Sequence, residues 1–523
     1  MGIPSYFSFI LKNYGSIISR LNRKVDNLYL DSNSIIYDTL RNLDAGSNFE
    51  ERLIHNVCVK IDEYIGRTAP SNTIFIAFDG VAPVAKLDQQ RNRRYLSTLE
   101  KKIHKSISKS DIPGWNSTAI TPGTSFMAKL GEYITGYYDK REHDYGVQKI
   151  IVSTSSEVGE GEHKIFQYIR DHPTFHKNHT TLVYGLDADL IMLCINHLPI
   201  SRKIFLFRET PEFVKSINME LEPNETYILN IPKLAHSITL LMNNNRAPST
   251  LQQKNRLYDY IFLSFFLGND FLPHFPSLNI RTQGIHVLLD AYKETIGKTE
   301  ENLTNGKTIY WKNVRKLITY LANDELTNLK HEYKIRNRWE KRSFPFKTEE
   351  EKLTRYLHIP IKNRETEKLI NPFSRGWEKR YYEYLFHQEV NDKFREKVCY
   401  NYLEGLEWTM HYYTSHCKDW RWSYRYHYPP LLQDLLSFIP HWEMDMIDKN
   451  NNKPVTPYIQ LAYVLPIESL HLLPDEIREV LLREKVHYYN SDSTIQWAFC
   501  KYFWESHVEL PNIDITELEN IIK

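Results

Sequence analysis

The sequence has 523 residues, 41% hydrophobic and 25% charged, which is ordinary for a globular protein with one large composite domain or several smaller ones. A formal net charge of +1 excludes a global field that attracts nucleic acid, so any polyanion site must come from local clustering. The sequence has no apolar run near the roughly 20 residues that span a bilayer, and its five scattered cysteines argue against disulfides or cysteine-ligated zinc, so we expect an intracellular, cytoplasmic protein without a membrane partner.

Short apolar strands alternate with helical stretches over residues 1–290, which is typical of an α/β domain. The first residues, MGIPSYFSFILKNYG, match neither a signal peptide nor a myristoylation motif, so we expect no targeting segment there. An apolar run at 256–270 is too long for a strand and predicts a buried helix that ends at Gly268 and Asn269. The predicted strands are 27–31, 73–80, 149–154, 182–187 and 203–207.

The chain changes character after residue 290. Residues 291–375 are polar, mixed in charge and weakly periodic, which predicts a solvated helical connector. Residues 376–475 are predicted to form a helical, aromatic-rich second block, and ten of the 29 residues from Tyr400 to Tyr428 are Trp or Tyr. Residues 476–523 are predicted to form short terminal helices.

Acidic residues follow the predicted strands. Three strands end in an aspartate, and in open α/β sheets ligands bind beyond the carboxyl ends of the strands. A further strand is followed by a pair of glutamates at i and i+2, and 182–187 by a second aspartate at the same spacing; an extended backbone would turn both members of a pair to one side. One more aspartate follows the buried helix. The seven acids are Asp31, Asp79, Glu160, Glu162, Asp187, Asp189 and Asp270.

Seven converging carboxylates would repel one another unless cations lay between them. Hard oxygen ligands suit Mg²⁺ or Mn²⁺, and two ions roughly 4 Å apart could activate a water and stabilise the leaving oxygen of a phosphodiester. A single strand-end aspartate more often caps a helix or forms a turn, so the interpretation rests on the whole set and on its pairs. We therefore predict that all seven acids are catalytic and metal-binding.

A basic stretch begins shortly after Asp79. From Lys86 to Lys105 there are seven Lys or Arg residues against two acids. On a helix, Lys86, Gln90, Arg93 and Arg94 would lie within roughly 80° of arc. Arginine forks suit phosphate oxygens, so this face next to the acids predicts a pocket for a terminal phosphate; the alternative is a solvated helix face.

The segment HCKDWRWSYRYHYPP interleaves aromatic with basic side chains, as surfaces that stack unpaired bases do. Trp420 and Trp422 are candidate stacking residues, as is Tyr37, six residues after Asp31. Trp and Tyr side chains in helices more often belong to the core, so this alternative stays open.

Several longer motifs resemble, in chain order, those of the XRN-type 5′→3′ exoribonucleases. In the first half they are MGIPSYF, NLYLDSNSIIY, FDGVAPVAKLDQQRNRR, GEGEHKI, YGLDADLIML and FLGNDFLPHFPSLNI. In the second half they are GWEKRYY, YLEGLEWTMHYY, DWRWSYRYHYPP and PVTPYIQLAYVLP. The resemblance runs from the first residue to about residue 475 and is interrupted by the connector.

The resemblance implies a PIN/FEN-like α/β nuclease core with a mostly parallel sheet, against which the helical second block packs and closes the active-site mouth. It implies that the seven acids bind two Mg²⁺ ions, which Mn²⁺ can replace. It implies that Lys86, Gln90, Arg93 and Arg94 hold the 5′-monophosphate of a single-stranded RNA and exclude a cap or triphosphate. The expected activity is processive degradation to 5′-mononucleotides in RNA decay, by a monomer.

Two features depart from the family pattern. Tyr37 stands where the family motif IIH presents a stacking histidine. The sequence also has neither the long C-terminal extension of the large cytoplasmic members nor the zinc knuckle of some nuclear ones. We therefore expect a compact catalytic core from a virus or another small genome, with protein partners that the resemblance does not define.

Two other functions stay open at this point. A flap or structure-specific DNA endonuclease could carry similar acids on the same scaffold, although the AKLDQQRNRR block and the second-half motifs favour the exoribonuclease. A catalytically inactive RNA-binding protein could keep the fold, although none of the seven acids is missing.

Overall fold

The centre of the computed structural model is a seven-stranded sheet in the order β1–β7–β6–β5–β2–β3–β4. The structure describes residues 5–44, 46–108, 115–211, 214–215, 219–448, 452–489 and 494–522, and none of the helices in these ranges is long and apolar enough to cross a membrane. The strands are β1 (Ile18–Ser19), β2 (Asn27–Asp31), β3 (Thr73–Ala77), β4 (Lys149–Ser153), β5 (Thr180–Tyr184), β6 (Lys203–Glu209) and β7 (Thr226–Leu229).

All five predicted strands are present, and they pair in parallel with one another in the order β4, β3, β2, β5 and β6. Every residue of β2 and β3 is buried, as expected for parallel strands covered on both faces. Two strands of this sheet that sequence analysis missed, β1 and β7, pair antiparallel at one edge, and their two and four residues are too short for a periodic signal.

The chain reverses its direction of travel across the sheet at β2. From β2 it moves outward through β3 to β4, and it then returns to β5 on the other side of β2. The carboxyl ends of β2 and β5 therefore flank a topological switch point, where open α/β sheets form their binding crevice. Asp31, the last residue of β2, lies at this position.

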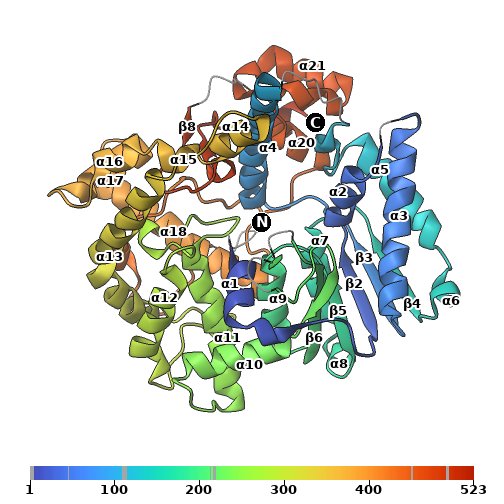
Figure 1. Ribbon diagram of the computed structural model, residues 1–523, viewed down its shortest axis with the longest axis horizontal. Coiled ribbons are helices and arrows are strands. Elements are labelled where there is room, and N and C mark those ends of the chain that lie inside the picture. The colour runs from blue at the N-terminus through green and yellow to red at the C-terminus, as the bar shows by residue number, and fades with distance from the viewer. Residues whose placement is uncertain are drawn as a thin grey trace.

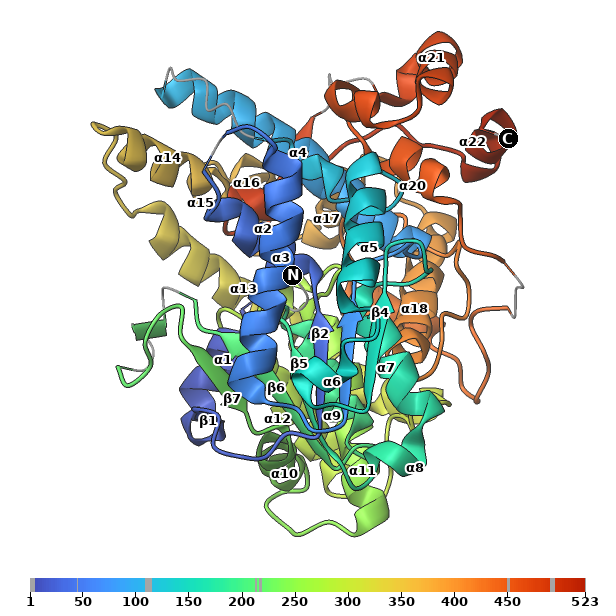
Figure 2. The same ribbon diagram turned by 90° about the vertical axis from the view of Figure 1, so that its right-hand side faces the viewer.

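Helices cover both faces of the sheet (Figures 1 and 2). Leu28 and Leu30 pack in a cluster with α3 and α5, whereas Tyr29 between them packs in the cluster that contains α7, α9, α10 and α11. This alternation confirms the expected α/β class. The helices of this half are α1 (Tyr6–Asn13), α2 (Asn33–Arg41), α3 (Phe49–Thr68), α5 (Ser125–Tyr138), α6 (Glu142–Tyr145), α7 (Gly161–Asp171), α8 (Pro173–His176), α9 (Asp189–His197), α10 (Ile231–Met242) and α11 (Thr250–Ser264).

The helix α4 (Val84–Ser108) rises beyond the sheet and lies beside the C-terminal helices (Figure 2). Arg91 donates to the carbonyl oxygens of Tyr488 at 3.0 Å and Pro511 at 2.8 Å. Asn92 donates to the carbonyl oxygen of Ser506 and accepts from the N–H of Val508. One side of α4 is thus fixed by the C-terminal segment. The elements of that segment are α20 (Pro457–Val464), α21 (Asp475–Glu484), β8 (Ile495–Gln496), β9 (His507–Val508) and α22 (Ile515–Ile521).

The second half is helical, as predicted, but the expected solvated connector is wrong. In α13, Trp311, Val314, Leu317, Ile318 and Leu321 are buried and belong to the same cluster as the helices on the sheet. Their spacing places them on one helix face, which packs inward, and farther along the helix the charged Glu325, Glu332 and Arg336 are buried as well. The helices are α12 (Gly284–Tyr292), α13 (Trp311–Glu340), α14 (Glu349–Leu357), α15 (Ile359–Lys362), α16 (Glu365–Ile370), α17 (Trp377–Phe386), α18 (Asp392–Thr414) and α19 (Leu432–Phe438).

The apolar run before Asp270 is a buried helix, as predicted. It forms α11 and a following 3₁₀ turn, Phe265–Leu267. Gly268 ends it with φ of +84°, and a Cβ there would lie 2.9 Å from the backbone nitrogen of His274. Only glycine fits this turn, which carries Asp270 to the sheet edge.

Candidate active site

The predicted acids gather at the carboxyl edge of four adjacent parallel strands. Asp31 ends β2, Asp79 lies two residues after β3, and Glu160 precedes α7 in the loop after β4. Asp187 lies between β5 and α9, and Asp189 begins α9. The negative charges of Asp79, Asp187 and Glu160 lie close enough to Asp31 to raise its pKa. The fold therefore brings these acids together.

The pairs at i and i+2 are arranged differently from the prediction. An extended backbone was expected between Asp187 and Asp189, but Ala188 is helical, with φ of −69° and ψ of −25°. Glu160 is extended, and Glu162 already lies in the first turn of α7. The turns from a strand into α7 and α9 therefore set the orientation of these acids. The positive N-terminal ends of the two helix dipoles favour the ionised carboxylates.

Gly161 allows α7 to approach two of the acids closely. A Cβ at this residue would lie 2.7 Å from Oδ1 of Asp31 and 3.4 Å from Oδ1 of Asp79. The N–H of Gly161 donates to Oδ1 of Asp79 at 2.7 Å. A larger residue between the two glutamates of GEGEHK would therefore collide with Asp31.

Sequence analysis missed Asn33, which holds Asp79, and Lys164, which holds the backbone next to it. Asn33 donates from Nδ2 to Oδ2 of Asp79 at 2.7 Å and accepts from the Asp79 N–H at 3.0 Å. Lys164 donates to the carbonyl oxygens of Phe78 at 2.8 Å and Thr154 at 2.7 Å. The Asn of DSNS and the Lys of GEHK are in the quoted motifs, but only the fold shows what they contact.

Lys86 lies among the acids. Its Nζ is 2.5 Å from Oε2 of Glu160 and 2.8 Å from Oδ2 of Asp270. Burial opposes its charge, but Asp270 and Glu160 outweigh burial and hold the pKa of Lys86 well above its usual range. In this structure the ammonium therefore pairs two acids, and its predicted contact with a phosphate stays a prediction.

Burial and mutual repulsion disfavour ionisation of several acids. Burial, followed by the charges of other acids, raises the pKa of Asp31 and of Glu162 well above the usual range. Burial and Asp270 raise the pKa of Asp189 to about 7. Burial acts in the same direction on Asp270, but Lys86 outweighs it and lowers the pKa of that carboxyl. Lys86 thus lowers the pKa of Asp270, whereas Asp31, Glu162 and Asp189 keep raised pKa values.

The donor set matches the chemistry of a hard divalent cation. Oδ1 of Asp31 and Oδ1 of Asp189 are buried without a hydrogen-bond partner, and carboxylate oxygens are the preferred ligands of Mg²⁺. Across the described ranges, no group of three or more His, Cys, Asp or Glu side chains has the arrangement of a finished metal site. The acids are instead held by Lys86 and hydrogen bonds, so metal binding would require them to rotate.

We expect the acid cluster to destabilise the metal-free protein progressively as the pH rises from 5 to 8. An acid whose pKa is higher in the folded state keeps its proton there, so its contribution is complete below about pH 4 and is lost towards the folded pKa, about 7 for Asp189. Melting temperatures measured in EDTA across this range check the slope.

Buried groups outside the site also change stability over this range, in both directions. The pKa values of Asp259 and Glu325 are raised, to about 7 and about 8, whereas burial lowers the pKa of His197 to about 3 and that of His274 to about 4, which stabilises the protein as the pH rises. The part of the slope that belongs to the site is therefore the difference between the wild type and Asp31→Asn, which should be shallower. Equal slopes would contradict a strained acid cluster.

The predicted phosphate face is helical, as the spacing required. Arg94 donates from Nη2 to Oγ1 of Thr121 at 2.6 Å, and burial lowers its pKa to about 10. Gln90 is half-buried with an unpartnered Oε1, and Arg93 is exposed. Tyr37 of α2 is close enough to Arg94 to affect its pKa. The helices α2 and α4 therefore lie near each other at the predicted phosphate face.

The three stacking candidates lie in different environments. The Tyr37 side chain is 38% exposed, and Trp420 is half-buried, its carbonyl accepting from the Val84 N–H at the start of α4. Trp422 is only 8% exposed, and its ring stacks on Trp408 at 5.2 Å. The Trp422 ring belongs to the core and also lines a cavity beside α4, so its predicted stacking role stays a prediction.

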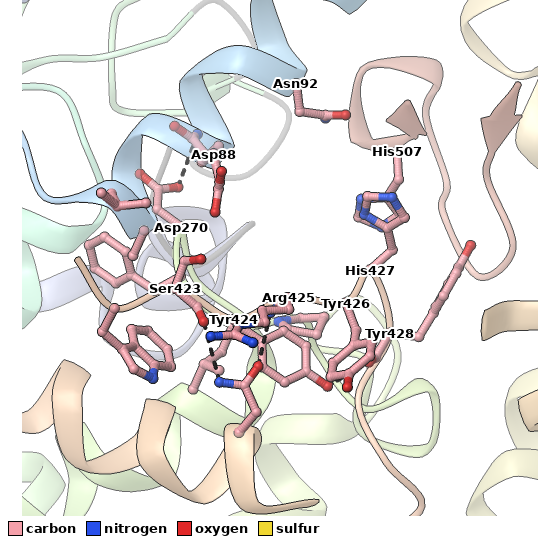
Figure 3. Close-up of a pocket in the computed structure, with 18 of the residues that line it drawn as sticks. Asp88, Asn92, Asp270, Ser423, Tyr424, Arg425, Tyr426, His427, Tyr428 and His507 are labelled. Carbon is pink, nitrogen blue, oxygen red and sulfur yellow. Dashed lines mark hydrogen bonds between the residues drawn. The ribbon is translucent and has the colours of Figure 1, made fainter. Parts of the chain in front are cut away.

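A cavity of about 1870 Å³ lies between α4, the aromatic segment and β9 (Figure 3). Of the seven acids only Asp270 lines it among the described residues, and Gln89, also at its wall, donates to Oδ1 of Asp270 at 3.4 Å. His427 and His507 stack at its far end, with ring centroids 4.9 Å apart. Asp270 and Gln89 therefore form the boundary between this cavity and the acid cluster.

Comparison with protein families gives two matches that together cover most of the chain. A model described as "XRN 5'-3' exonuclease N-terminus" matches residues 1–210. A model described as "Xrn1 helical domain" matches residues 251–368 and 346–523. The first match contains the whole parallel part of the sheet, and the second contains the helical half.

Curated relatives are similar over nearly the whole chain. The 5'-3' exoribonuclease 2 of Arabidopsis thaliana is 27% identical over 98% of this chain and 66% of its own length. The 5'-3' exoribonuclease 2 homolog of Drosophila melanogaster is 27% identical over 98% and 70%, and the 5'-3' exoribonuclease 1 of Saccharomyces cerevisiae is 28% identical over 93% and 40%. The chain thus spans about two thirds of the first two relatives and less than half of the third.

Proposed function

Because the chain belongs to the XRN 5'-3' exonuclease family, we propose that it is a processive 5′→3′ exoribonuclease. Its substrate would be single-stranded RNA with a 5′-monophosphate, and its products 5′-mononucleotides. The observation that carries the proposal is the convergence of acids from four adjacent parallel strands beside the basic side of α4. A flap endonuclease would share the acids, but the match of the helical half to an XRN model favours the exoribonuclease.

We propose two Mg²⁺ ions as cofactors, with Mn²⁺ as a substitute. When bound, they would lower the pKa of a water and stabilise charge on the phosphate that is cleaved. The unpartnered oxygens of Asp31 and Asp189 and the raised pKa values of the cluster support cation binding here. The residues that would hold the ions are Asp31, Asp79, Glu160, Glu162, Asp187, Asp189 and Asp270.

The side chains of α4 would hold the 5′ end of the RNA. Arg94 is anchored by Thr121 and half-enclosed, so its remaining donors can bind oxygens of a terminal phosphate, and Gln90 and Arg93 lie on the same side of the helix. The half-exposed ring of Tyr37, near Arg94, can stack on a base next to that phosphate. A triphosphate would bring further negative charge towards the acids and would be disfavoured.

We propose that the protein acts in a reducing compartment such as the cytoplasm. All five of its cysteines are free, which supports this location. We propose that the chain acts as a monomer and that RNA is its partner.

One RNA with three different 5′ ends tests the proposal. We expect monophosphorylated RNA to be converted to mononucleotides from its 5′ end, hydroxyl and triphosphate RNA to decay about 100-fold more slowly, and EDTA to stop all decay. A time course with 3′-labelled RNA, in Mg²⁺ and in EDTA, measures all three. Preferential cleavage of a DNA flap junction would identify a flap endonuclease, and binding without turnover an inactive RNA-binding protein.

A further inference from the structure

We propose that Tyr412, in the second half of the chain, is a positioning residue for the acid site. Its hydroxyl donates to Oε1 of Glu160 at 2.8 Å, across 252 residues of sequence. Both side chains are buried, Tyr412 being 4% and Glu160 3% exposed. Through this bond α18 reaches into a site that is otherwise built from the α/β core.

The two oxygens of Glu160 are held by different elements. Oε2 accepts from Lys86 of α4 at 2.5 Å, and Oε1 accepts from Tyr412 of α18. Of these two partners only the tyrosine is neutral. A metal ion that took the place of the Lys86 ammonium would leave the bond from Tyr412 intact, so the hydroxyl can keep the carboxylate oriented in both states.

The ring of Tyr412 is itself immobilised. It stacks with His163, at 3.7 Å between centroids, and with Trp408, at 4.8 Å, while Phe271 meets it nearly edge-on at 5.6 Å. His163 directly follows Glu162 on α7, and Phe271 directly follows Asp270. The ring therefore contacts the neighbours of two further acids, and its hydroxyl is placed with little freedom to move.

The adjacent tyrosine lies near another acid. Tyr413 is 2% exposed, and Asp189 is close enough to raise the pKa of its hydroxyl, after burial. Two consecutive residues of α18 thus reach Glu160 and Asp189, which come from different strands. We infer that the second half of the family fold is needed for the chemistry because it orients the acids, in addition to any part it has in enclosing RNA.

This inference rests on the proposed function, since it assigns Tyr412 to the orientation of a metal ligand. Groups that orient metal ligands typically change metal affinity or activity by 10- to 100-fold when they are removed. Tyr412→Phe keeps the stacked ring and removes only the donor. We expect it to weaken binding of Mn²⁺ about 10-fold in calorimetric titration of the full metal-free chain, with melting temperature and KM for RNA unchanged.

Tyr381→Phe is the matched control, because the buried Tyr381 hydroxyl donates to the Pro429 carbonyl at 3.0 Å, away from the acids. Equal Mn²⁺ affinities of Tyr412→Phe and Tyr381→Phe would overturn the inference and leave the proposed function standing. In a Glu160→Gln background, Tyr412→Phe should add no further loss; an undiminished loss there would show that Tyr412 does not act through Glu160. A wild-type chain that neither binds Mn²⁺ nor degrades RNA would overturn the proposed function, and this inference with it.

Discussion

Replacing Asp31 with asparagine is expected to abolish RNA degradation and at the same time to stabilise the metal-free protein. Asp31 lies at the switch point of the sheet, where burial and the charges of Asp79, Asp187 and Glu160 disfavour its ionised form. Asparagine has nearly the same shape and removes one of the repelling charges. The same change removes an anionic oxygen from the proposed metal site.

The expected sizes of the two effects are measurable separately. Turnover of monophosphorylated RNA should fall about 1,000-fold, which corresponds to about 4 kcal/mol in the activation barrier. The melting temperature in EDTA should rise by about 1–3 °C, as expected when a strained functional site is relieved. Quenched time courses of RNA decay test the loss of turnover, and thermal melts with and without Mg²⁺ test the change in stability.

Asp44→Asn serves as the control, because Asp44 is an exposed aspartate outside the acid cluster. It should change neither turnover nor stability. If Asp31→Asn retained turnover, Asp31 would not be a ligand of a required metal. If the variant lost turnover and also melted earlier in EDTA, the acids would not be strained in the way that their raised pKa values indicate.

Replacing Arg94 with glutamine is expected to remove the preference for a 5′-monophosphate. Arg94 is anchored by Thr121 and half-enclosed, and its burial is strong enough to lower its pKa to about 10. A buried guanidinium of this kind gains most when a phosphate is bound to it. Loss of bonds to a charged group worth about 3 kcal/mol would slow decay of monophosphorylated RNA about 100-fold.

The comparison of RNA ends decides whether Arg94 recognises the phosphate. Decay of 5′-hydroxyl RNA, which lacks the phosphate, should be unchanged in Arg94→Gln, so the ratio between the two substrates should approach one. Arg94→Lys should recover only part of the preference, because an ammonium cannot form the two-pronged contact of a guanidinium. Lys101→Ala, an exposed site on the same helix, controls for general charge loss. Equal slowing of both substrates would indicate a structural role for Arg94.

Much of the α/β half could be predicted because its signals are local. The strands that carry Asp31, Asp79 and Asp187 are continuous apolar runs, and a parallel sheet must present their carboxyl ends at one edge. The basic side of α4 follows from helical spacing alone. These features depend on residues within a few positions of one another, and the family motifs coincide with them.

Other features depended on contacts that no local pattern encodes. α13 was predicted as a solvated connector because its polar flanks obscured the apolar face that packs inward. Trp422 is in the core because Trp408, on the facing helix, covers its ring. β1 and β7 are short and are defined by their pairing at the β6 edge of the sheet.

The sequence by itself determined which acids would stand at the ends of which strands, because strand formation and its termination are properties of short segments. Only the tertiary structure decided what each acid touches: Lys86 between Glu160 and Asp270, Asn33 on Asp79, and Tyr412 on Glu160. The physical reason is that a buried charge needs a hydrogen-bond or charge partner within a few ångströms. Folding supplies these partners from helices that are tens to hundreds of residues away in the sequence.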